Sequence, residues 1–142
     1  MKKSPSQIID QITDLDSHTE FEFEKGTIGS ILGKSIFNVC FSHDVNITIR
    51  EALAWGIIGE LYLSHIFTGY PIERMRSFQY EIKESIGSIG INCLWYDDIV
   101  DLCIQENSST FTLINSDNDY IQQMVSRDII LETLDFCRES LN

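Results

Sequence analysis

The longest apolar run of the chain lies between residues 49 and 68, and four of its small or polar positions recur every four residues. On an α-helix such positions share one narrow stripe, and the rest of the circumference is apolar. They are Gly56, Glu60, Ser64 and Thr68. Thr48 and Glu51 match a capping box at the start of the run, and Gly69 follows its end. We therefore predict a helix over residues 49–68 that is buried at the centre of the fold.

The same run has almost the length of a membrane span, which needs about 20 consecutive apolar residues. Glu60 would then lie near the middle of the bilayer, where an isolated charge is costly. The N-terminal residues contain no apolar stretch of signal-peptide length, because side chains such as Asp10 and Asp14 interrupt it. We therefore expect a cytoplasmic protein that does not bind a membrane.

Helical spacing of apolar residues recurs on both sides of the central run. The segments that show it cover residues 5–16, 27–41, 71–86 and 92–105. Gly29 and Gly33 weaken the second segment, because each glycine costs about 1 kcal/mol relative to alanine inside a helix. Close packing against another helix would explain both glycines. Turn and cap residues at 116–119 predict a terminal helix, or a pair of helices, after them.

Two short segments have the composition of strands. Residues 20–24 alternate glutamate with phenylalanine, and residues 110–114 are rich in β-branched and aromatic side chains. These two segments could pair with each other. The predicted fold is therefore mainly α, a single domain over residues 1–142 in which five to six helices surround the central helix, with at most a small two-stranded β element.

Charge adds a strong bias to this picture. The formal net charge is −12, and residues 84–142 carry two basic side chains against eleven acidic ones. A field of this sign repels nucleic acid and anionic membranes, and it speeds association with a basic partner. Solubility alone is the simpler explanation for the same charge.

If the acidity serves binding, the acidic residues of two C-terminal segments are the first candidates for the contact surface. They are Asp97, Asp98, Asp101, Asp117 and Asp119. Asp97 and Asp101 would share a helix face, where like charges repel, so their presence suggests a use. Tolerated surface repulsion is the alternative. The predicted aromatic anchors are Trp95, Tyr96 and Tyr120.

A second acidic row consists of Glu20, Glu22 and Glu24. On a strand, side chains two residues apart are separated by about 7 Å, which is close to the spacing of phosphates along a nucleic-acid strand. Such a row could imitate a phosphate backbone in front of a basic protein. An edge strand that its charges keep soluble is the alternative interpretation.

Residues suited to catalysis are few. The three histidines, His18, His43 and His65, have no partners at metal-ligand spacing, and the four cysteines are scattered, as is typical of reduced core thiols. Residues 29–35 depart from a phosphate-binding loop, because three residues instead of four separate the two glycines. We predict no enzymatic activity, no cofactor and no metal.

In size, acidity and lack of catalytic motifs, the chain resembles the immunity proteins of bacterial toxin systems, including those of contact-dependent growth inhibition. The resemblance rests on composition and length, and no motif carries it. It implies an inhibitor that binds a basic toxin domain, a nuclease, and occupies the substrate cleft. A type III secretion chaperone is the alternative, and it would require a dimer with a continuous sheet. A second alternative is a small metal-dependent enzyme in which Asp97 and Asp98 hold Mg²⁺.

Overall fold

The computed structural model describes residues 4–13 and 26–141 of the chain, and residues 20–24 lie outside this part. The described residues form six α-helices, a short 3-10 helix and two strands. In chain order these are α1 (Pro5–Thr13), α2 (Ser30–Ser42), α3 (Ile49–Thr68), α4 (Ile72–Ile86), η1 (Cys93–Trp95), α5 (Tyr96–Asn107), β1 (Thr110–Ile114), β2 (Tyr120–Met124) and α6 (Arg127–Leu141). The predicted fold class, mainly helical with one small β element, is confirmed.

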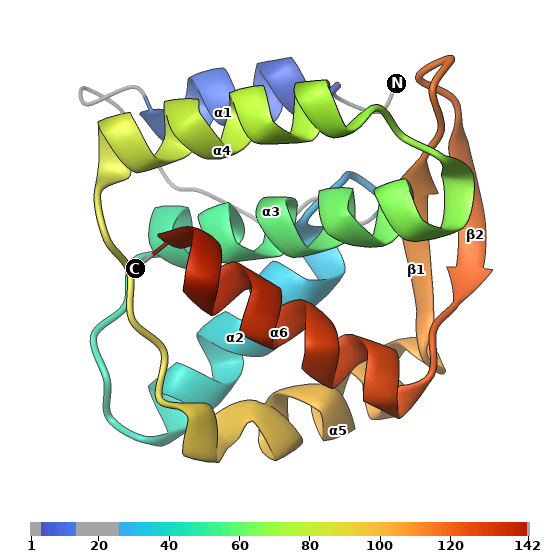
Figure 1. The fold of residues 1–142 in the computed structure, drawn as a ribbon. Coiled ribbons are helices and arrows are strands. Elements are labelled where there is room, and N and C mark those ends of the chain that lie inside the picture. Colours follow the sequence, from blue (N-terminus) through green and yellow to red (C-terminus); the bar gives the residue numbers. More distant parts are fainter. Residues whose placement is uncertain (1–3, 14–25, 142) are drawn as a thin grey trace.

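Helix α3 lies in the middle of the molecule (Figure 1). Helices α1 and α4 lie on one side of it, α2, α5 and α6 lie on the other, and the β-hairpin closes one end. The sequence sets its ends as predicted. The amide of Glu51 donates to the Thr48 hydroxyl over 3.0 Å, the Glu51 carboxylate accepts from the amide of Thr48 over 3.1 Å, and Gly69 ends the helix with a left-handed φ of 73°.

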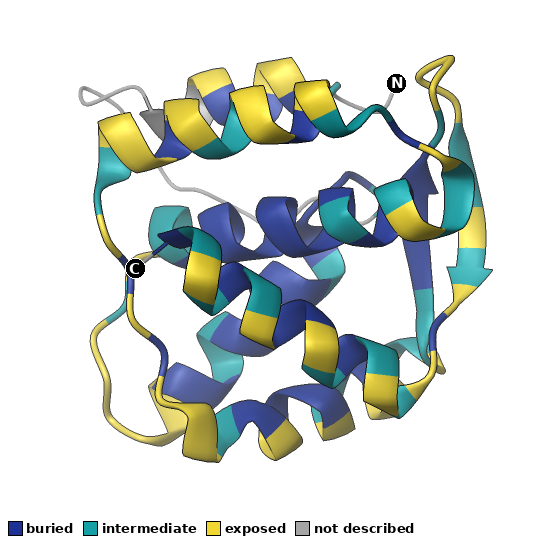
Figure 2. Cartoon of the chain, in the orientation of Figure 1, coloured by how far each residue is buried: buried dark blue, intermediate teal, exposed yellow. Residues whose placement is uncertain are grey.

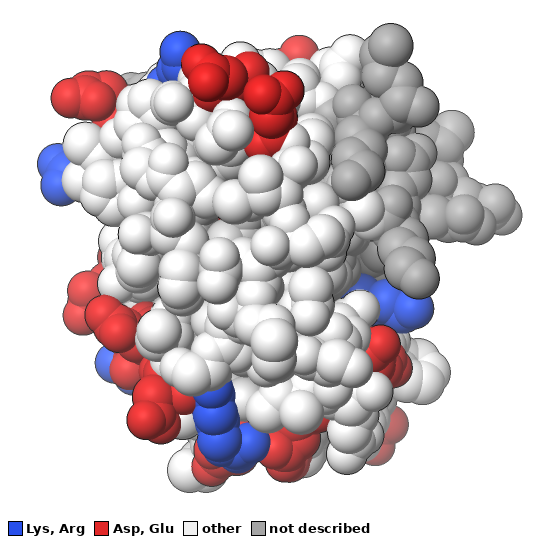
Figure 3. Space-filling view, turned by 90° about the vertical axis from the view of Figure 1, so that its right-hand side faces the viewer, with Lys and Arg blue, Asp and Glu red and all other residues white. Residues whose placement is uncertain are grey.

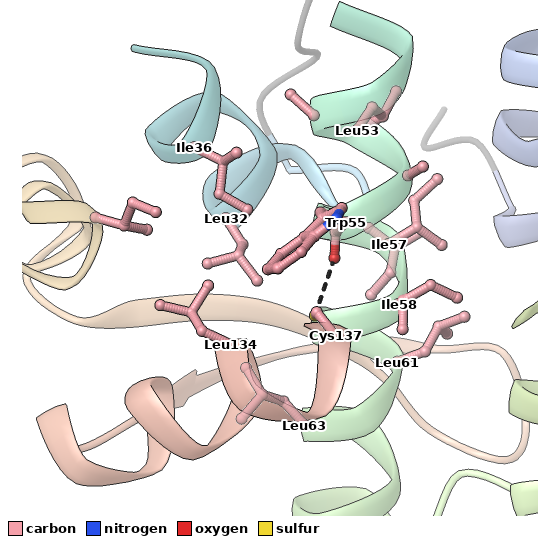
Figure 4. Packing of buried hydrophobic residues seen from close by; sticks show 14 of the residues in the cluster. Leu32, Ile36, Leu53, Trp55, Ile57, Ile58, Leu61, Leu63, Leu134 and Cys137 are labelled. Carbon is pink, nitrogen blue, oxygen red and sulfur yellow. Dashed lines mark hydrogen bonds between the residues drawn. The ribbon is translucent and has the colours of Figure 1, made fainter. Parts of the chain in front are cut away.

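The core surrounds α3 on nearly every side. Figure 2 shows α3 largely buried, while α4, α5 and α6 expose their outer faces. Side chains from α2 and α6, such as Leu32 and Leu134, pack beside the residues of α3 (Figure 4). Trp55 is fully buried and its indole N–H donates to the carbonyl of Ile89 over 3.1 Å. No helix in the described part of the chain is long and apolar enough to cross a bilayer.

Gly29, which directly precedes α2, and Gly33 within it serve the close approach that the sequence predicted. A Cβ at Gly56 of α3 would lie 2.2 Å from the carbonyl oxygen of Gly29 and 2.8 Å from the Cα of Gly33. The two helix backbones therefore touch here, and only residues without side chains fit between them. Gly29 also adopts a φ of 89°, which favours glycine.

The prediction that residues 116–119 open a helix is wrong. They form the turn of a hairpin in which β1 pairs antiparallel with β2, Leu113 facing Ile121. The Asn115 side chain holds the turn by accepting from the amides of Asp117 and Asp119, over 3.0 and 2.9 Å. Asn and Asp side chains build such turns as readily as they cap helices, so the local pattern alone did not separate the two.

Candidate functional site

In the described part of the chain, three places bring polar or charged side chains together. One is the polar stripe of α3 inside the core, and the other two are surface hollows. The first hollow lies between α2 and α5, and the second is enclosed by α3, α4 and α6.

Glu60, in the centre of the stripe, is fully buried and holds the beginning of α2. Its two carboxylate oxygens accept from the amide of Gly29 over 2.9 Å and from the amide of Leu32 over 2.8 Å. A helix N-terminus favours negative charge. Burial nevertheless raises the pKa of Glu60 to about 8, against the opposing effect of these backbone N–H groups. Because both oxygens already have protein partners, Glu60 positions α2 and does not meet a ligand.

The remaining stripe residues hold β1 in the same way. The Ser64 hydroxyl accepts from the amide of Ile114 over 3.1 Å, and the Thr68 hydroxyl donates to the carbonyl of Ile114 over 2.7 Å. The stripe is therefore a set of main-chain attachments inside the fold. The four-residue spacing in the sequence predicted a shared face, but it did not reveal this use.

The buried thiols are unsuited to nucleophilic chemistry. Burial raises the pKa of Cys103 to about 12, and its Sγ lies 3.3 Å from the Ser35 hydroxyl. Burial also raises the pKa of Cys137, whose Sγ donates to the carbonyl of Trp55 over 3.4 Å (Figure 4). Both side chains therefore remain protonated thiols at neutral pH.

The first hollow contains part of the predicted acidic surface. It has a volume of about 460 Å³, and Asp98, Asp101 and Glu106 of α5 line it together with residues of α2. His43 stacks on the ring of Trp95, with 4.3 Å between ring centroids, and its Nε2 lies 3.6 Å from an oxygen of Asp98. Trp95 thus has a partner within the chain.

The argument from repulsion between Asp97 and Asp101 does not hold. Arg127, at the start of α6, lies between the two carboxylates and donates to both, over 3.0 Å in the case of Asp97. The hydrogen bond to Asp101 raises the pKa of Arg127 most, and the one to Asp97 raises it further. The guanidinium group compensates the two charges, so no functional reason is needed for the pair. The sequence contained a signal, since residues 84–126 include no basic side chain and Arg127 directly follows them.

The other predicted contact residues are dispersed. The hairpin turn with Asp117 and Asp119 lies at the far end of the hairpin from α5 (Figure 1). Viewed from the hairpin side, a broad area without charged side chains separates the acidic residues above from those below (Figure 3). The five aspartates therefore do not form one surface. Glu20, Glu22 and Glu24 lie outside the described residues.

The two predicted tyrosine anchors differ from expectation. Tyr96 is only 6% exposed and packs edge-on against Trp55, so its ring cannot reach a partner from this position. Among the described side chains its hydroxyl is buried without a hydrogen-bond partner. Tyr120 is partly buried on β2, and burial raises its pKa to about 12. Helical spacing puts Tyr96 on the core side of α5, which a list of surface aromatics overlooks.

The second hollow was missed by sequence reasoning. It has a volume of about 450 Å³, and its walls combine apolar and polar side chains. The polar ones include Tyr62, His65, Arg76 and Gln79, from α3 and α4. No motif links these residues, because the packing of three helices brings them together.

Comparison with known proteins points to enzymes. No protein-family model matches the chain. A 3-dehydroquinate synthase from Parabacteroides distasonis is 35% identical over 118 residues, which cover 79% of this chain and 33% of that protein. A crystal structure of 2-deoxy-scyllo-inosose synthase, complexed with carbaglucose-6-phosphate, NAD⁺ and Co²⁺, matches 79% of this chain and 32% of its own with a TM-score of 0.58. Its sequence identity is 20%, so it shows a common fold alone.

The chain thus spans about a third of the length of the proteins that it matches. These matches overturn the resemblance to immunity proteins and the basic toxin partner inferred from it. The prediction that the chain is not an enzyme is also contradicted, because both similar proteins are enzymes. Acidity and size are shared by many unrelated proteins, and for this reason they misled the functional assignment.

The Co²⁺ and NAD⁺ of the inosose synthase structure call for a test of fit. In the described part of this chain, no three His, Cys, Asp or Glu side chains are grouped so that they could hold a metal ion. His43 lies against Trp95, and the Nδ1 of His65 is engaged by the carbonyl of Tyr70 over 2.8 Å. Gly56 of α3 occupies the space beside Gly29 and Gly33, which leaves no room for a dinucleotide there. These residues do not fit either group.

Proposed function

We propose that this chain provides the helical part of a cyclase of the 3-dehydroquinate synthase kind, acting on a phosphorylated sugar. One observation carries the proposal, namely the 35% identity over 118 residues to a 3-dehydroquinate synthase. The common fold with 2-deoxy-scyllo-inosose synthase supports it, since the match covers 79% of this chain in both comparisons. Of the earlier interpretations, the enzyme alternative agrees best with these matches.

A second candidate follows from the donor groups in the structure. Because the described residues lack a group of metal ligands, the chain would in this case be a relative that binds a similar small molecule without catalysing ring closure. The two candidates share the fold and the ligand class, and they differ in turnover.

A chimeric enzyme separates the candidates. In the Parabacteroides distasonis protein, the matched third is replaced by this chain, and the ring-forming reaction of the parent enzyme on its own substrate is followed by NMR. Turnover by the chimera supports the cyclase. A folded chimera that binds the substrate without turnover supports the second candidate. A chimera that does not fold, beside a folded parent and a folded isolated chain, contradicts both.

The control for the chimera is the same fusion with Gly56→Val. A valine side chain at this position would overlap the backbone of α2, so the control should lose its fold. If the control folds as well as the unmodified chimera, the inserted segment does not pack as it does in this structure.

A further inference from the structure

The hollow between α3, α4 and α6 has the size of a small-molecule site. Its volume of about 450 Å³ lies within the usual range of such sites, roughly 300–1,000 Å³. Met75, which is 2% exposed, and Ile72 supply apolar surface from α4. On the opposite side the rings of Tyr62 and Phe136 stack, with 4.2 Å between their centroids and 17° between their planes. This stack adds aromatic surface to the apolar lining of the hollow.

The polar side chains of the hollow are held in place by neighbours. The Tyr62 hydroxyl donates to Glu132 over 3.0 Å, and the Gln79 amide donates to the Ser140 hydroxyl over 2.6 Å. The Nδ1 of His65 lies 2.8 Å from the carbonyl of Tyr70. Since a carbonyl only accepts, Nδ1 carries the proton, and Nε2 remains for a ligand. The amide oxygen of Gln79 has no partner among the described residues, so two acceptors are already oriented.

Arg76 supplies the one positive charge among the side chains that line this hollow. It is exposed, and within the described part of the chain it has neither an ion pair nor a hydrogen bond. Arg74 on the same helix differs, because its guanidinium donates to the carbonyl of Ser116 over 3.3 Å. Arg127 and Arg138 are both paired with aspartates. Arg76 is therefore available to an anionic ligand at the hollow.

The carboxylate of Glu132 restricts the ligand further. It accepts from the hydroxyl of Tyr62, one of the lining residues, and the chain as a whole carries a charge of −12. A bare anion would be repelled by these charges. A ligand that adds hydroxyl groups can donate to Glu132 and to Gln79 while its anionic group pairs with Arg76.

We infer that this hollow binds a small cyclic polyol with one anionic substituent, a phosphate or a carboxylate. Arg76 pairs with the anionic group, His65 and Gln79 accept from hydroxyl groups, and the apolar and aromatic lining packs against the ring carbons. The inference rests on the proposed function for the choice of a sugar phosphate as probe. The site itself is deduced from the contacts above.

The test is isothermal titration of the full chain with glucose 6-phosphate, with Arg76→Gln as the variant and Arg74→Gln as the matched control. Both arginines are exposed on α4, so both variants should fold, and circular dichroism verifies this. We expect the wild type and the control to bind equally and the Arg76→Gln variant to bind at least tenfold more weakly. Unphosphorylated glucose should bind the wild type more weakly than glucose 6-phosphate by a similar factor. Absence of binding, or equal loss in both variants, overturns the inference.

Inorganic phosphate distinguishes recognition of the ring from recognition of the anion. If phosphate alone binds as tightly as glucose 6-phosphate, the polyol part of the inference is wrong. The chimera separates this inference from the proposed function. If binding depends on Arg76 but the chimera shows no turnover, the site is supported and the cyclase is rejected. If the chimera shows turnover but binding does not depend on Arg76, the cyclase is supported and the site is rejected.

Discussion

At Gly56 the backbones of α2 and α3 are so close that a single methyl group decides the stability of their contact. A Cβ there would lie 2.2 Å from the carbonyl oxygen of Gly29 and 2.6 Å from the amide nitrogen of Gly33, and neither backbone atom can rotate away. In an open helix, replacing glycine by alanine would gain about 1 kcal/mol. Overpacking of a rigid contact costs about 1–3 kcal/mol or more, so here the sign reverses.

We predict that Gly56→Ala lowers the free energy of unfolding by about 2 kcal/mol, because the overlap outweighs the gain in helix propensity. Urea denaturation monitored by circular dichroism measures this change. Gly90→Ala is the control, since a Cβ at Gly90 meets nothing within 4 Å. A Gly56→Ala variant as stable as the control would mean that the helices are farther apart than described.

Glu60 predicts how the stability of the protein depends on pH. Its pKa in the folded state is about 8, well above the ordinary value of 4.5, because burial penalises the charged form. Between these two values the folded state holds a proton that the unfolded state has released. Stability therefore falls as pH rises through this interval and becomes level above about pH 8, with a change of the order of a few kcal/mol.

The measurement is a series of urea titrations between pH 5 and 9 on the wild type and on Glu60→Gln. The variant cannot release a proton, so its stability should decline less over this interval, although the amide group will weaken the contact with Gly29 or Leu32. Parallel pH profiles for the two proteins would show that Glu60 is ionised in the folded state throughout.

At the scale of elements, Arg127 joins α6 to α5 through Asp97 and Asp101. Without it, two like charges would face each other on one side of α5. We predict that Arg127→Ala lowers the melting temperature at low salt and that the loss shrinks in 1 M salt, where the Debye length is about 3 Å. Differential scanning calorimetry at both salt concentrations tests this.

Arg138→Ala is the comparison for Arg127, because Arg138 pairs with Asp135 within α6 and connects no two elements. Its effect on the melting temperature should be smaller. Removing Asp97 in the Arg127→Ala background should restore part of the lost stability by relieving repulsion. If Arg127→Ala melts like the wild type at low salt, the bridge contributes nothing, as is the case for many surface ion pairs.

The elements were predictable where one physical signal dominated. Helix α3 followed from its apolar run and its capping box, and the close approach at Gly29 and Gly33 followed from glycines in a helical pattern. The hairpin was not predicted, because Asn115 and its neighbours suit a turn and a helix cap equally. The repulsion expected between Asp97 and Asp101 was misjudged for a different reason. Charges were counted along the sequence, whereas Arg127 neutralises its partners from another helix.

At the scale of the whole molecule, function was less predictable than fold. The similarity to 3-dehydroquinate synthase is spread over 118 residues, and we recognised no short motif in the chain that indicates it. The second hollow also has no sequence signal, since its residues come from three helices. What the sequence alone offered was charge, and charge describes solubility and association rates more than chemistry.

A divalent cation should not stabilise the described part of this chain. The described residues contain no group of three potential ligands, so they give a divalent cation nothing to bind tightly. We predict that dialysis against a chelator, or addition of Co²⁺, leaves the melting temperature unchanged. A ligand present at 100 times its dissociation constant would add about 2.7 kcal/mol, which calorimetry detects easily.

A cation-dependent rise in melting temperature would require ligands, and substitution locates them. If the rise disappears in His43→Ala or Asp98→Asn, a metal site exists at the first hollow. The contacts of His43 with Trp95 and Asp98 would then not prevent it from binding a metal ion. If it persists in both and disappears when Glu20, Glu22 and Glu24 are changed to glutamine, the ligands lie outside the described residues. The described helical core would then still be free of metal, as its donor groups indicate.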